Sequence, residues 1–136
     1  MKQVIVLGAN GHTAREIIAR LLEQKDVELT LFARRAERLR DYNGKGVHVI
    51  EADARDLIAL REAIRRQDIV INAMGGMELG DLTEGVVKVM EELGVRRIIA
   101  ISAGGIYDEL PGPFNSWDKD MVGHTRPTNR KTADVI

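Results

Sequence analysis

The chain has 136 residues, of which 44% are hydrophobic and 30% charged, with a formal net charge of -1 and no cysteine. This length and composition predict one globular domain. The nearly neutral charge argues against general electrostatic binding to nucleic acid or an anionic membrane. The lack of cysteine excludes disulfides, thiolate catalysis and cysteine metal sites. The apolar run at 4–7 is too short for a signal peptide and no segment approaches membrane-spanning length, so we expect a cytoplasmic protein.

Hydrophobic periodicity predicts strands and helices that alternate along the chain. The apolar runs 4–7, 69–71 and 98–101 are nearly continuous, which is typical of strands in a sheet covered on both faces. This pattern predicts an α/β fold, a doubly wound parallel sheet of the Rossmann type, with strand order 3-2-1-4-5. The expected strands cover residues 2–7, 27–33, 47–50, 68–72 and 96–102. The expected helices cover residues 11–24, 35–40, 55–66 and 79–93, the last ended by Gly94.

The composition changes after Ser102, where glycines and prolines at 104–113 predict a long loop. The tail is compatible with a helix from Asn129 onward. Because that helix would lead into a sixth strand, we expect a C-terminally truncated sheet. Residues 1–136 would then form one domain that lacks a substrate-covering segment. The edge of the strand at 96–102 would be open and would favour self-association.

The segment Gly-Ala-Asn-Gly-His-Thr-Ala at residues 8–14 is the most informative motif of the chain, because it joins a predicted strand to a predicted helix. Gly8 would allow a sharp turn, Gly11 would let a phosphate approach the backbone, and Ala14 would let the helix pack close to the strand. The unpaired N–H groups at a helix N-terminus favour such an anion. The motif therefore predicts a loop that binds the pyrophosphate of a dinucleotide. The alternative is a turn that uses its glycines only for geometry.

Two arginines follow the second predicted strand, at a position where the bound ribose of a dinucleotide would lie. A site for NAD usually has an acidic residue there for the ribose 2′-hydroxyl, whereas a site for NADP uses arginine for the 2′-phosphate. The segment Phe-Ala-Arg-Arg at residues 32–35 contains no acid. Because a guanidinium group can hold a phosphate with two hydrogen bonds, Arg34 and Arg35 predict a preference for NADP(H) over NAD(H). The alternative is a solvated arginine pair that opens a surface helix.

The remaining strand ends supply further candidates at the same edge of the sheet. Asp53, beside Ala54, would either accept a hydrogen bond from the adenine amino group or cap the helix expected from Arg55. The small residues at 73–75 (Ala-Met-Gly) would lie beside a ribose, or form a plain glycine turn. Ser102 would lie near the nicotinamide, or simply end its strand.

Taken together, these segments resemble an atypical short-chain dehydrogenase/reductase. The similarity is to NAD(P)H-binding proteins that include flavin and biliverdin reductases and regulators of the nitrogen-metabolite-repression type, and it covers essentially the whole chain. It implies a cofactor-binding Rossmann domain. Conventional members of this family use a Tyr-x-x-x-Lys pair, but Tyr42 is followed by Lys45 and Tyr107 by Pro111 at the fourth position. This departure places the usual tyrosine mechanism in doubt, although atypical members can lack the pair.

Two functions follow as hypotheses. The first is a reductase that transfers hydride from NADPH to a small organic acceptor, with Ser102 and Tyr107 near the nicotinamide as candidate catalytic residues. The second is a non-catalytic module that senses NADP(H). The three histidines lack the spacing of metal ligands, and we assign no metal site. The candidate cofactor contacts are Gly8, Asn10, Gly11, His12, Thr13, Arg34, Arg35, Asp53, Ala54, Ala73, Met74, Gly75 and Ser102.

Overall fold

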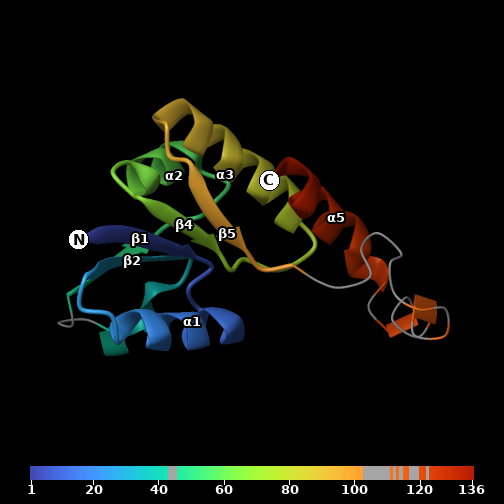
Figure 1. Cartoon of the computed structure of the whole chain (residues 1–136), viewed down its shortest axis with the longest axis horizontal. Helices are drawn as coiled ribbons and strands as arrows, with labels where there is room; N and C mark the ends of the chain where they lie inside the picture. Colours follow the sequence, from blue (N-terminus) through green and yellow to red (C-terminus); the bar gives the residue numbers. More distant parts are fainter. Residues whose placement is uncertain (43–45, 103–110, 112, 114, 117–119, 122) are drawn as a thin grey trace.

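A computed structural model of the chain describes residues 1–42, 46–102, 111, 113, 115–116, 120–121 and 123–136. Five parallel strands form one sheet in the order β3-β2-β1-β4-β5, which confirms the predicted doubly wound fold (Figure 1). The strands are β1 (Lys2–Leu7), β2 (Val27–Ala33), β3 (Val47–Glu51), β4 (Ile69–Asn72) and β5 (Arg97–Ala100). The helical elements are α1 (His12–Leu22), η1 (Ala36–Tyr42), α2 (Leu57–Ile64), α3 (Leu79–Leu93), η2 (Gly123–Thr125) and α5 (Arg126–Val135).

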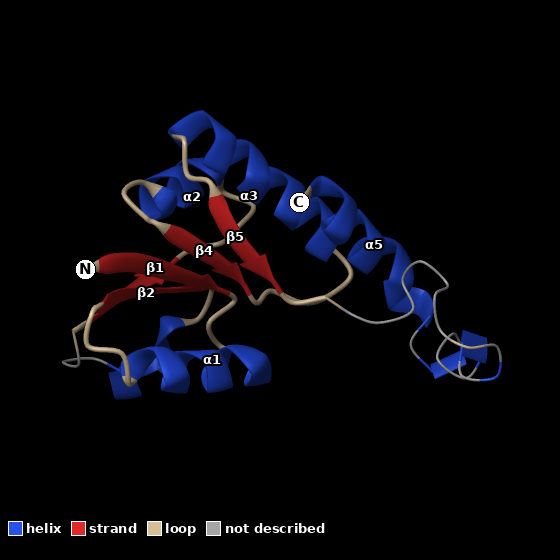
Figure 2. Ribbon diagram, viewed as in Figure 1, coloured by secondary structure: helices blue, strands red, loops and turns tan. Residues whose placement is uncertain are grey.

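Helices cover the two faces of the sheet, with α1 on one side and α2 and α3 on the other (Figure 2). Because successive side chains of a strand point to opposite faces, the central strand β1 serves both cores. Val4 and Val6 pack in a cluster with Ile18 of α1. Ile5 and Leu7 pack in a second cluster with residues of α2 and α3. All four β1 side chains are at most 2% exposed, which explains the continuous apolar run in the sequence.

Several helix boundaries differ from the predicted ones for identifiable reasons. The second α-helix begins at Leu57 rather than Arg55, because the side chain of Asp56 accepts hydrogen bonds from the backbone N–H groups of Ile58 (3.1 Å) and Ala59 (3.2 Å). The C-terminal helix begins at Arg126 instead of Asn129, with a proline in its first turn, where the missing N–H is tolerated. Gly94 ends α3 in the left-handed conformation, as predicted.

Helix α5 lies along α3, close to the loop that follows β4 (Figure 1). The hydroxyl of Thr128 accepts a hydrogen bond from the backbone N–H of Gly80 (2.7 Å), in the first turn of α3. A Cβ at Gly80 would lie 2.8 Å from the Cβ of Lys131, so the glycine allows the two helices to approach closely. Lys131 pairs with Asp81 and Glu84 of α3. Within the described ranges, no helix has both the length and the apolar character needed to span a membrane.

Candidate functional site

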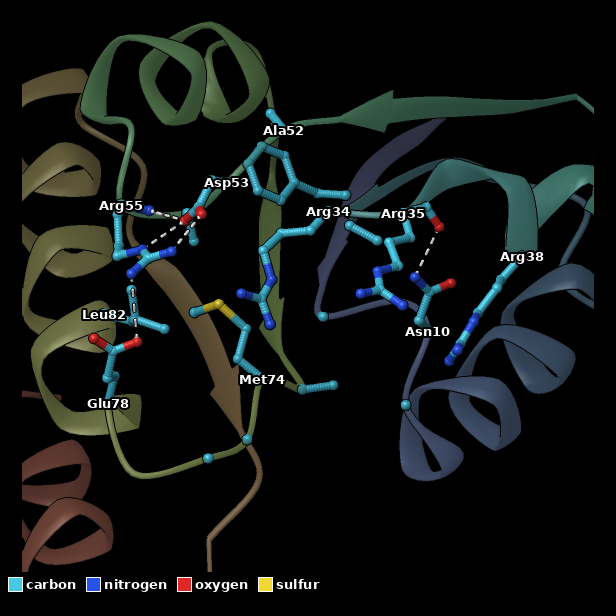
Figure 3. Close-up of a pocket in the computed structure, with 18 of the residues that line it drawn as sticks. Asn10, Arg34, Arg35, Arg38, Ala52, Asp53, Arg55, Met74, Glu78 and Leu82 are labelled. Carbon is cyan, nitrogen blue, oxygen red and sulfur yellow. Dashed lines mark hydrogen bonds and ion pairs between the residues drawn. The ribbon is translucent and has the colours of Figure 1, made fainter.

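A cleft of about 760 Å³ opens at the carboxyl ends of β1 to β4, where the strand order reverses (Figure 3). Loops that follow these four strands form its walls, as the rule for ligand sites in open α/β sheets requires. Its described lining consists of Gly8, Asn10, Gly11, Phe32, Ala33, Arg34, Arg35, Arg38, Ala52, Asp53, Ala54, Arg55, Ala73, Met74, Gly75, Gly76, Met77, Glu78 and Leu82.

The glycine loop is fixed against two neighbouring strands. The backbone N–H of Gly8 donates to the carbonyl of Phe32 (3.1 Å) at the end of β2. Gly8 has a φ of +76°, and a Cβ there would lie 2.8 Å from the N and Cα of Met74, in the loop after β4. Only glycine fits this combination of left-handed backbone and close contact. Gly11 is different, because its φ of -72° suits any residue and the nearest atom to a Cβ would be the Gly8 carbonyl oxygen at 3.6 Å.

The first turn of α1 lacks the usual side-chain partners. Gly11 is the N-cap residue, and in the described structure no side chain caps the helix and no acidic residue stands in its first turn. Exposed N–H groups at a helix start carry partial positive charge and require an acceptor. Helix α2 differs in this respect, because the side chain of Asp56 accepts hydrogen bonds from its first backbone N–H groups. The start of α1 therefore offers backbone donors beside the cleft for an anionic ligand.

Three arginines follow one another along one side of the cleft. Arg34 and Arg35 extend from the end of β2, and Arg38 extends from η1 (Figure 3). None of the three guanidinium groups forms an ion pair with the residues that the structure describes. The side-chain amide of Asn10 joins this group to the glycine loop, because its Nδ2 donates to the carbonyl of Arg35 (2.8 Å). The Oδ1 atom of Asn10 is buried without a hydrogen-bond partner in the described chain. This side of the cleft thus carries positive charge that no described ion pair balances, and Arg34 lies near enough to Asp53 for its charge to help lower the pKa of that carboxyl.

The neighbouring part of the cleft, formed by the loop after β3, is electrostatically paired. Asp53 accepts hydrogen bonds from the side chain of Arg55 (Nη2 to Oδ2, 2.9 Å; Nε to Oδ1, 3.2 Å) and from its backbone N–H (2.9 Å). These side-chain and backbone hydrogen bonds lower the pKa of Asp53 to about 2. The carboxylate is therefore ionised at neutral pH and acts only as an acceptor. It does not cap α2, because Asp56 has that role.

A buried polar network shapes the loop after β4. Asn72 is 1% exposed, and its Nδ2 donates to the hydroxyl of Thr83 in α3 (2.9 Å). Its Oδ1 accepts from the backbone N–H of Met74 (3.2 Å). Thr83, which is fully buried, donates in turn to the carbonyl of Leu79 (2.7 Å). The side-chain nitrogen and oxygen of Asn72 and the hydroxyl of Thr83 each have a partner, so the network fixes the loop that contacts Gly8.

We expect Thr83→Val to destabilise the fold by about 1–3 kcal/mol, because it leaves the buried amide of Asn72 without its acceptor. Thr132→Val is the matched control, since Thr132 is equally buried (1% exposed) and its hydroxyl donates only to the carbonyl of Thr128 (2.9 Å). Urea unfolding of the two variants should show a clearly larger loss for Thr83→Val. Equal losses would mean that the network does not contribute through Asn72.

The cleft brings together ten of the predicted site residues and leaves out the others. Those that line it are Gly8, Asn10, Gly11, Arg34, Arg35, Asp53, Ala54, Ala73, Met74 and Gly75. His12 and Thr13 open α1, are exposed and lie outside the described lining. Ser102 is also exposed and outside it, two residues beyond the end of β5. Tyr107 lies outside the described residues.

The structure adds lining residues that sequence reasoning did not select, above all Arg38, Arg55 and Glu78. A signal existed for Arg38, because it follows Arg35 by one turn of a 3₁₀ helix and such residues share a face. Arg55 follows Asp53 by two residues, the spacing of a side-chain-to-backbone turn. No local signal could have identified Glu78, because its role depends on how the loops meet in space.

The sheet order and the glycine loop at its switch point define a Rossmann-type dinucleotide-binding fold. The chain belongs to the NAD(P)H-binding family, whose match covers residues 8–136.

A short-chain dehydrogenase/reductase from Veillonella parvula DSM 2008, solved in complex with NADP, is 28% identical with a TM-score of 0.88, over 98% of this chain and 63% of that one. A Rossmann-fold NAD(P)-binding family protein from Shigella flexneri is 28% identical with a TM-score of 0.74, over 98% and 60%.

Among curated proteins, pinoresinol reductase 2 from Arabidopsis thaliana is 24% identical over 97% of this chain and 42% of its own length. The chain therefore spans about two fifths of this relative and less than two thirds of the two solved structures. These matches confirm the predicted resemblance to an atypical group of NAD(P)H-binding reductases.

Proposed function

We propose that this cleft binds NADP(H) in preference to NAD(H), and that the chain supplies the cofactor domain of a reductase that transfers hydride to a small organic acceptor. The observation that carries the cofactor preference is the group of three arginines, two at the end of β2 and one in η1, none of which forms an ion pair with a described carboxylate. The two described carboxylates of the cleft, Asp53 and Glu78, are both engaged by Arg55. A 2′-phosphate would balance the excess charge.

The described lining supports a cofactor that extends along the cleft. Gly8, Gly11 and the uncapped start of α1, with the adjoining His12 and Thr13, would hold the pyrophosphate. Asn10, whose Nδ2 donates to the carbonyl of Arg35, would hold the glycine loop beside the arginines. Asp53, with Ala54, would face the adenine base. The small residues at 73–75 would leave room for the second ribose.

The bound cofactor would supply a hydride, and the protein would orient and shield it. Ser102 and Tyr107 remain the candidate groups near the nicotinamide. The competing proposal, a non-catalytic sensor of NADP(H), predicts the same cofactor affinity without turnover. A panel of quinone, flavin and aldehyde acceptors, followed by NADPH absorbance, separates the two. Oxidation of NADPH above the rate without protein supports the reductase; tight binding with no oxidation for any acceptor supports the sensor.

The cofactor preference has its own test. Arg34→Ala combined with Arg35→Ala should weaken NADPH binding by about 10- to 100-fold, because charge-assisted hydrogen bonds to the 2′-phosphate are lost, while NADH binding stays nearly unchanged. Arg40→Ala is the matched control, since Arg40 is an exposed arginine of η1 outside the described lining. Fluorescence titration with both cofactors gives the four affinities. Wild-type protein that binds NADH as tightly as NADPH would refute the preference.

A further inference from the structure

Arg55 connects two loops of the cleft through its guanidinium group (Figure 3). It stands in the loop between β3 and α2, where it forms a two-pronged contact with Asp53. Its Nη1 atom lies 3.8 Å from Oε2 of Glu78, which stands at the start of α3 in the loop after β4. The arginine side chain is 57% exposed and the Asp53 side chain 37% exposed, so a ligand in the cleft can reach both.

The contact restricts how the Asp53 carboxylate is oriented. A free aspartate rotates about two side-chain bonds, whereas a guanidinium fork binds both carboxylate oxygens in one plane. The backbone N–H of Arg55 holds Oδ1 from a third direction. An ionised carboxylate has about four acceptor positions, so these bonds leave acceptor capacity for a donor in the cleft. Glu78 provides the guanidinium with a second contact across the loops.

We propose that Arg55 is a positioning residue for recognition of the cofactor's base: it holds Asp53 ready to accept a hydrogen bond from the exocyclic amine of adenine, with Glu78 as its second anchor. This inference rests on the proposed function, in which the adenine end of the cofactor occupies this part of the cleft. It makes the site selective for the substituent at the six position of the purine, because a carboxylate held toward that substituent is not free to turn to the N1–H that hypoxanthine also carries. Hypoxanthine carries a carbonyl oxygen where adenine carries the amine, and two acceptors facing each other cannot form a hydrogen bond.

The test compares NADPH with its reduced hypoxanthine analogue in fluorescence titrations. Wild-type protein should bind NADPH about tenfold or more tightly than the analogue, as expected for one hydrogen bond to a charged group. Arg55→Gln should weaken NADPH binding by about tenfold and leave the analogue nearly unchanged. Arg55→Lys should lose affinity in the same direction, because a single ammonium group cannot form the fork. Glu78→Gln should give a smaller loss of the same kind.

Two controls separate positioning from general damage. Arg61→Gln removes a comparable exposed ion pair, which Arg61 forms with Glu92 (2.9 Å) outside the described lining of the cleft. This variant should change neither the affinity for NADPH nor that for the analogue. Asp53→Asn should abolish the discrimination between the two cofactors. If Arg55 acts through Asp53, Arg55→Gln on that background should add no further loss.

The outcomes are distinguishable. If wild-type protein binds NADPH but Arg55→Gln leaves the ratio of the two affinities unchanged, the inference is overturned while the proposed function stands. The same holds if Arg55→Gln still costs affinity in the Asp53→Asn background. If wild-type protein binds neither cofactor, the proposed function fails and this inference fails with it.

Discussion

Gly11→Val is expected to keep the fold and to lose at least about a hundredfold in NADPH affinity, since a pyrophosphate held there would lose two or more charge-assisted hydrogen bonds. The valine fits the backbone, because Gly11 has a φ of -72° and a Cβ would come no closer than 3.6 Å to the Gly8 carbonyl oxygen. Its branched side chain would, however, stand at the start of α1, in the described lining of the cleft. The measurement is a fluorescence titration with NADPH.

The control for this variant is Glu16→Val, which adds the same side chain at an exposed position of the same helix, outside the described lining. Urea midpoints of both variants should stay close to that of wild-type protein. Unchanged NADPH affinity in folded Gly11→Val would refute the assignment of the glycine loop to the pyrophosphate. A large drop in the urea midpoint would instead show that Gly11 supports the fold.

The fold could be predicted from the sequence because the patterns that indicate its strands and helices are local and repeated. Apolar runs such as 4–7 and 69–71 mark strands buried on both faces, and only a few connections between parallel strands are allowed. The boundaries of the helices and strands were harder to predict. Which aspartate caps α2 depends on the geometry of the loop. The guanidinium group of Arg55 binds Asp53, and Asp56 caps the helix.

The residues of the candidate site likewise fall into those that could be predicted from the sequence and those that could not. Residues that directly follow a strand, such as Arg34 and Asp53, could be selected because parallel strands end at one edge of the sheet. Pairs of residues that join distant segments could not be predicted, because no local sequence pattern marks either partner. The buried bond between Asn72 and Thr83 and the contact between Arg55 and Glu78 both belong to this class. The first depends on how α3 packs against β4 and the second on how the starts of α2 and α3 meet, which no single segment encodes.

Gly8 shows the same dependence on tertiary packing, and Gly8→Ala is the variant expected to damage the fold most. The alanine would have to adopt a φ of +76° with its Cβ 2.8 Å from the N and Cα of Met74 and 2.9 Å from the carbonyl oxygen of Ala73. These are backbone atoms, and Ala73 is itself held by a hydrogen bond from its N–H to the carbonyl of Leu7 (3.0 Å). Left-handed strain and overpacking together should cost roughly 2–5 kcal/mol.

Gly94→Ala separates the two contributions to that loss. Gly94 ends α3 with a φ of +72°, close to that of Gly8, but apart from its own chain neighbours no described atom lies within 4 Å of a Cβ built there. This variant should therefore lose only the cost of the left-handed backbone, about 1–2 kcal/mol. Urea unfolding of the two variants measures the difference, which is the energy of the close contact between the glycine loop and the loop after β4. Equal losses would show that this contact relaxes freely, and that Gly8 is needed for its turn alone.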